Sequence, residues 1–177
     1  AFLDWATSAP ESALADPGQL DAHDPLVTAA GEGDLQACQD LLRHTPADGP
    51  WHASRPCETP LHAAAKSGEL AAARLLIDRG AKLTAHTNSH VLPLHVAVQH
   101  GHTTVATCLL DAGAPLDARD WNRWSALFYA VVGRTHAMVE LLVSRGCALN
   151  ARDHWGRTAL SWACEKGDGP TVQRLLE

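Results

Sequence analysis

One motif returns along this chain at a fixed interval, and that interval restricts the possible folds more than any other feature. The frame begins at Thr59-Pro60-Leu61-His62 and recurs three more times, each copy 33 residues after the last. An earlier copy lies 35 residues before it. The recurring leucines are Leu26, Leu61, Leu94, Leu127 and Leu160. A period of this length indicates a stack of similar structural units.

Each unit carries the residue types of two short helices joined by a tight turn. An alanine stands three residues after each leucine, which gives the first helix an apolar stripe. A glycine stands seven after it in four copies and suits the turn. Two short helices cannot bury their apolar faces alone, so the units must stack into a solenoid.

These residues resemble the ankyrin-repeat family. Thr59-Pro60-Leu61-His62-Ala63-Ala64, followed by Gly80-Ala81, is similar to the ankyrin signature. Ala118-Arg119-Asp120 and Asn150-Ala151-Arg152-Asp153 are similar to its hairpin segment. The resemblance covers residues 24–177 and implies paired antiparallel helices with projecting fingers. It also implies a protein-binding scaffold that uses the fingers and inner helices as a concave surface.

We therefore predict an all-α fold, an ankyrin-repeat solenoid of about five helix-turn-helix repeats with short β-hairpin fingers. Residues 1–23 form a separate N-terminal segment, and we expect its Phe2, Leu3 and Trp5 to cap the first repeat. The solenoid is predicted to span residues 24–177. Its repeats are predicted near residues 24–58, 59–91, 92–124, 125–157 and 158–177.

Some repeats depart from the family pattern. Phe128 stands where the family has a histidine, and Arg134 stands where it has the turn glycine. Leu92 replaces the threonine that would bond His95. The resemblance therefore implies that the hydroxyl–imidazole bonding between neighbouring repeats is complete only in the second repeat.

Charge and cysteine content exclude several classes of function. The net charge is −6, so the chain as a whole does not favour nucleic acid. Residues 1–50 carry nine acids against one arginine, whereas residues 118–157 carry three acids against six arginines. No apolar run reaches the roughly 20 residues needed to cross a bilayer. Five cysteines without metal-ligand spacing indicate free thiols, which favours the cytoplasm or nucleus.

No pattern of catalytic or metal-binding residues is present. The pair His100 and His102 flanks the turn glycine Gly101, and spacing fixes no third ligand. Cys38 and Cys147 align with small packing residues, which leaves the loop residue Cys57 as the one candidate reactive thiol. We therefore expect no enzyme activity, no cofactor and no metal.

The candidate binding surface lies on the fingers before Leu127 and Leu160. Three of the six tryptophans fall there, and tryptophan and arginine dominate interaction hot spots. We expect Trp121 and Trp155 to be exposed, and Trp124 to pack against the stack as well as border the surface. An aromatic cage for a methylated ammonium is a second reading of the three tryptophans. The predicted partner-binding residues are Gln99, His100, Arg119, Trp121, Arg123, Trp124, Arg152, His154, Trp155 and Arg157.

The sequence thus predicts a non-catalytic scaffold that binds another protein or peptide carrying acidic and apolar residues. We expect a monomer that binds neither nucleic acid nor membrane. The alternative is a targeting or substrate-recruiting domain of a larger enzyme. It is suggested by a first residue that is Ala rather than Met and by an end inside the second helix of the fifth repeat, which together suggest a fragment.

Overall fold

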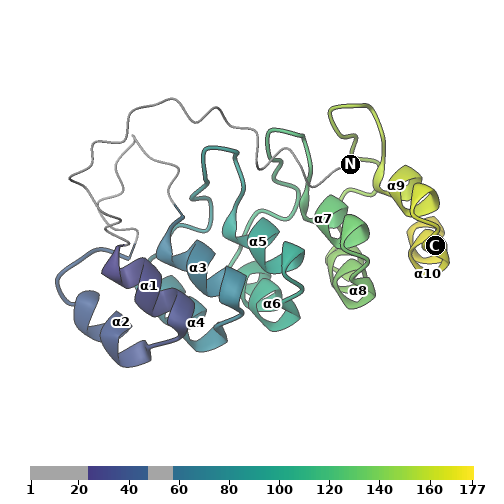
Figure 1. The fold of residues 1–177 in the computed structure, drawn as a ribbon. Helices are drawn as coiled ribbons and strands as arrows, with labels where there is room; N and C mark the ends of the chain where they lie inside the picture. Colours follow the sequence, from purple (N-terminus) through teal and green to yellow (C-terminus); the bar gives the residue numbers. More distant parts are fainter. Residues whose placement is uncertain (1–23, 48–57) are drawn as a thin grey trace.

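The computed structural model describes residues 24–47 and 58–177, and these residues form five successive pairs of short α-helices (Figure 1). In chain order the helices are α1 (Pro25–Glu32), α2 (Leu35–Leu41), α3 (Pro60–Ser67), α4 (Leu70–Asp78), α5 (Pro93–Gln99), α6 (Thr103–Asp111), α7 (Ala126–Val132), α8 (His136–Ser144), α9 (Ala159–Glu165) and α10 (Gly169–Leu176). The all-α solenoid predicted from the repeat is confirmed.

The helices lie in two rows. The first helix of each pair packs against the first helix of the next, and the second helices α2, α4, α6, α8 and α10 form the outer row. One continuous apolar cluster runs through all five pairs, from Leu26 to Leu175. The fingers project from the side of the first, inner row (Figure 1). They hold the candidate site.

The turn within a pair depends on glycine in a way that reaches into the next repeat. Gly68 ends α3 with φ of +80°, a conformation that suits glycine because it has no Cβ. A Cβ at this position would stand 2.5 Å from Nδ1 of His102. The His102 ring occupies that space because its Nε2 bonds the carbonyl of Lys66 at 2.9 Å. The glycine therefore also makes room for a contact between repeats.

Arg134 holds the equivalent turn of the fourth repeat. Its φ is +54°, so a bulky residue adopts the conformation that glycine holds at Gly33, Gly68, Gly101 and Gly167. The sequence-based departure from the family pattern therefore has a structural cost. The left-handed conformation costs a residue with a Cβ about 1–2 kcal/mol.

We expect Arg134→Gly to raise the free energy of unfolding by about 0.5–1 kcal/mol, because relief of the strain exceeds the entropy that glycine adds to the unfolded chain. Urea denaturation measures this change. Arg79→Gly is the control, because exposed Arg79 ends α4 with φ of −90° and relieves no strain. If both variants were equally destabilised, strain at Arg134 would not be the cause.

Each finger folds back through one closing hydrogen bond rather than a ladder. The bonds run from the N–H of Thr87, Asp120 and Asp153 to the carbonyls of Val91, Trp124 and Arg157, at 2.9–3.0 Å. Among the described residues, the only β-bridge outside named strands pairs Arg152 with Thr158. The fingers are therefore tight turns, shorter than the predicted β-hairpins, because each reversal is too brief for further pairing.

The expected N-terminal cap, residues 1–23, and the reactive thiol considered at Cys57 lie outside the described residues.

Candidate partner-binding site

Buried histidines hold the base of the first two fingers. Nε2 of His62 lies 3.0 Å from the carbonyl of Val91, and Nε2 of His95 lies 3.0 Å from that of Ala118. A carbonyl only accepts, so Nε2 carries the proton and Nδ1 is an acceptor. Burial lowers the pKa of both imidazoles, although these hydrogen bonds oppose the shift. Both rings are therefore neutral structural ties.

The hydroxyl–imidazole bond predicted for the second repeat is present. Thr59 Oγ1 lies 2.8 Å from Nδ1 of His62. In the third repeat, Nδ1 of His95 accepts the N–H of Leu92 at 3.2 Å. In the fourth repeat Phe128 is fully buried at the same position, and the Ser125 hydroxyl beside it is buried without a hydrogen-bond partner. The three repeats therefore fix their fingers by different means.

The fingertips are linked to one another in the same register. The N–H of Trp121 donates to the carbonyl of Ser89 at 3.2 Å, and 33 residues later His154 donates to Asn122 at 2.9 Å. Each fingertip thus bonds to the one before it. Since backbone groups make these links, the side chains at the tips remain available for other contacts.

Trp121 is the most exposed tryptophan among the described residues, with 67% of its surface accessible. Its ring lies 5.7 Å from that of His90, which in turn stacks on His86 at 4.5 Å. The three rings form an aromatic strip across two fingers. The prediction that Trp121 is exposed is confirmed.

Trp155 is also exposed, at 54%, and lies on the third finger. The guanidinium carbon of Arg157 lies 5.1 Å from the centre of its ring, within the range of a cation–π contact. The His154 ring meets it edge-on at 5.9 Å. Trp155 is therefore exposed to a partner yet held by its neighbours.

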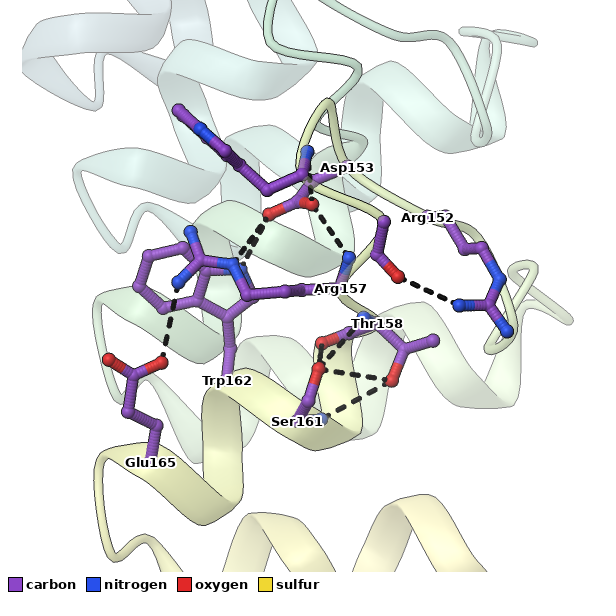
Figure 2. A network of polar contacts seen from close by, with 9 residues as sticks. Arg152, Asp153, Arg157, Thr158, Ser161, Trp162 and Glu165 are labelled. Atoms are coloured by element: carbon purple, nitrogen blue, oxygen red, sulfur yellow. Dashed lines mark hydrogen bonds and ion pairs between the residues drawn. The ribbon is translucent and has the colours of Figure 1, made fainter.

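A buried carboxylate organises this third finger (Figure 2). Asp153 is 1% exposed, and its Oδ1 accepts the N–H groups of Trp155 and Arg157 at 2.9 and 2.8 Å. Its Oδ2 accepts Nε1 of Trp162 at 2.9 Å and Nε of Arg157 at 3.3 Å. Burial alone would raise the pKa of Asp153, but these hydrogen bonds and the charge of Arg157 hold it below its usual range.

Arg157 and Arg152 differ from the free cations that the sequence predicted. The Arg157 guanidinium lies 3.7 Å above the Trp162 ring and also pairs with Glu165 at 3.4 Å (Figure 2). Arg152 donates to the carbonyl of Gly156 at 2.8 Å. Both arginines thus serve the finger itself. Arg119 and Arg123 are exposed, and within the part of the chain that the structure describes neither has an ion-pair partner.

Trp124 belongs mainly to the interior. Its ring meets those of Tyr129 and Trp162 edge-on, each at 5.5 Å, and lies 6.2 Å from Phe128. Its indole N–H is buried without a hydrogen-bond partner. This packing confirms the structural part of the expectation, and it leaves Trp124 a poor wall for an open aromatic cage.

A comparison with protein families agrees with the geometry. A family model described as ankyrin repeats, three copies, matches residues 26–120 and 94–177. The chain belongs to the ankyrin-repeat family. A search of curated proteins found no match.

The inner helices of these ankyrin repeats end beside the fingers. Gln99 and His100 are exposed at the end of α5, as predicted from the register. The His100 ring stacks on that of His102 at 6.3 Å, and burial together with His102 lowers the pKa of His100. Among the described residues, no group of three or more His, Cys, Asp or Glu side chains is placed to hold a metal.

The thiols that the repeat alignment assigned to packing are buried. Burial raises the pKa of Cys147 to about 11 and also raises that of Cys38, which disfavours the reactive thiolate. Cys164 is exposed on α9. No helix in the described ankyrin repeats is long and apolar enough to span a membrane.

Sequence reasoning missed two features of the ankyrin fingers. The first is the His86–His90 stack, and the second is the Asp153–Arg157–Trp162 contact set. A usable signal existed for the first, because His90, Arg123 and Gly156 occupy one register position where glycine is the residue of low strain.

Proposed function

We propose that this chain is a non-catalytic interaction module that binds another protein through the tips of its fingers. Ankyrin repeats are generally protein–protein interaction modules. The observation that carries the proposal is the exposure of Trp121 and Trp155, at 67% and 54%, on neighbouring fingers. Large apolar side chains held in water at adjacent sites are typical of binding surfaces.

Backbone strain at the fingertips supports the same surface. His90 and Arg123 have φ of +58° and +62°, where the third finger has Gly156 at +78°. Strained residues of this kind cluster at functional sites. The side chains of His90 and Arg123 lie beside Trp121 in the chain or in space, so retaining them at this cost suits a role in binding.

The partner we propose carries acidic and apolar residues. Arg119 and Arg123 are exposed and lack ion-pair partners in the described chain, so an acidic partner would meet the finger of residues 114–124 first. Such charges speed encounter and orient the partner more than they add affinity. Trp121 and Trp155 would supply most of the binding energy.

The setting we propose is the cytoplasm or nucleus, where free thiols persist, with the chain acting as a monomer. The same surface would also serve a recruiting domain in a larger enzyme.

Trp121→Ala combined with Trp155→Ala is expected to weaken partner binding at least about 30-fold, or about 2 kcal/mol, because hot-spot tryptophans carry that much energy. Pull-down with quantitative mass spectrometry identifies the partner, and titration then measures the affinity. Leu35→Ala with Leu176→Ala is the control, because these two exposed apolar residues lie away from the fingers.

A partner that is lost by the tryptophan variant and kept by the leucine variant supports the finger surface. Equal binding by both variants excludes it, and would direct attention to the outer helices, where Leu35, Leu70 and Leu75 line a shallow groove. Arg119→Glu should mainly slow association and reduce its salt dependence. Circular dichroism verifies that each variant is folded.

A further inference from the structure

The exposed groups on the fingers of residues 81–91 and 114–124 form a surface that is both aromatic and cationic. We call His86, His90, Trp121, Arg119 and Arg123 the fingertip surface. The acids on the second of these fingers are already bonded within the fold. Asp120 accepts the hydroxyl of Tyr129 at 2.8 Å, and Asp117 accepts the N–H of Ala148 at 2.8 Å.

The chain itself contains a segment of the opposite character. Residues 1–23 hold four acids and no lysine or arginine. The acids are Asp4, Glu11, Asp16 and Asp21. Phe2, Leu3 and Trp5 surround Asp4, so acidic and aromatic groups occur together in one short stretch. This is the composition that the fingertip surface would bind.

Charge separates this location from the cap expected on the first repeat. The described residues of that repeat, 24–47, contain four acids and one arginine, a net charge of −3. The acids are Asp24, Glu32, Asp34 and Asp40. A segment with four further acids is repelled there, whereas Arg119 and Arg123 attract it. Electrostatics therefore favours the fingers over the end of the stack.

The segment is long enough to reach the fingers. Twenty-three extended residues span up to about 75 Å. Helices pack about 10 Å apart, so the three steps from α1 to α7 cover roughly 30 Å. A tether of this kind gives an effective concentration in the millimolar range, so even a weak contact is populated.

We infer that residues 1–23 fold back onto the fingertip surface and act as an internal ligand that a protein partner must displace. Tryptophan rings and arginine side chains of the fingers contact the aromatic and acidic groups of the segment. The contact exists without any partner, so its test is separate from that of the proposed function.

The indole N–H signals of the full-length ¹⁵N-labelled chain provide the test, with each tryptophan assigned by a Trp→Phe substitution. Neutralising the segment should displace the Trp121 signal; the substitutions are Asp4→Asn, Glu11→Gln, Asp16→Asn and Asp21→Asn. Reversing the finger charges with Arg119→Glu and Arg123→Glu should displace the Trp5 signal. Trp162 should not move in either variant, because its buried indole bonds Asp153.

A matched control changes the same amount of charge on other exposed acids, namely Glu32→Gln, Asp40→Asn, Asp78→Asn and Asp111→Asn. It should leave the Trp5 and Trp121 signals in place. The inference is overturned if the Trp5 signal ignores the finger charges and the Trp121 signal ignores the segment. It is equally overturned if Trp5 responds instead to Leu35→Ala on the first repeat, since the segment would then be a cap.

Discussion

Asp153→Ala is expected to lower the free energy of unfolding by about 4 kcal/mol. The substitution leaves Nε1 of Trp162 and the guanidinium of Arg157 without their shared acceptor, and removal of one member of a buried charged pair costs about 3–5 kcal/mol. Two backbone N–H groups of the finger lose their acceptor as well. Chemical denaturation followed by tryptophan fluorescence measures the loss.

Asp117→Ala is the matched control for that experiment. Asp117 also accepts a finger N–H, that of Ala148 at 2.8 Å, but it is exposed to water. We expect a cost of about 1 kcal/mol or less, because water replaces the lost carboxylate. Equal losses in the two variants would show that burial of Asp153 does not determine its contribution.

The stability of the fold is expected to fall by about 1–2 kcal/mol between pH 7 and pH 5.5. Burial lowers the pKa of His62 and His95 in the folded state, so the unfolded chain binds protons first as the pH falls through about 6.5. Stability is therefore complete above that pH and declines below it, by at most about 1.4 kcal/mol per pH unit for each histidine. Urea denaturation across this range measures the slope.

His62→Phe combined with His95→Phe should flatten this dependence. Phe128 already fills the equivalent position of the fourth repeat with no exposed surface, so the ring itself fits such a site. At pH 7 the double variant should lose about 3 kcal/mol, because the carbonyls of Val91 and Ala118 lose their donors. His44→Gln, at an exposed position, should leave the profile unchanged. A slope that survived in the double variant would assign it to other groups.

The repeat architecture followed from the sequence because it depends on local residue types at fixed offsets. Turn glycines such as Gly68, the structural histidines and the exposure of Trp121 and Trp155 all obey the 33-residue register. The neutral role of His62 was also predictable, since its alignment with His95 marks it as part of the framework.

The charge available on the fingers was not predictable from the same pattern. Arg119 and Arg157 look alike in sequence, yet only Arg157 stands close to a buried aspartate and over the face of Trp162. The side chain that neutralises it comes from the next helix, and its position depends on rotamers and packing. Counting arginines therefore overstated the positive charge offered to a partner.

The close fit of His102 against Gly68 also limits how this lineage can change. Any other residue at position 68 would collide with the imidazole of the following repeat and adopt a strained φ of +80°. In contrast, Arg134 has already been accepted at the equivalent turn two repeats later. The order of evolutionary steps therefore matters, because a smaller side chain at position 102 must come before any replacement of Gly68. Repeats that descend from one ancestral unit have in this way become dependent on their own neighbours, and they can no longer be exchanged or reordered without loss of fitness.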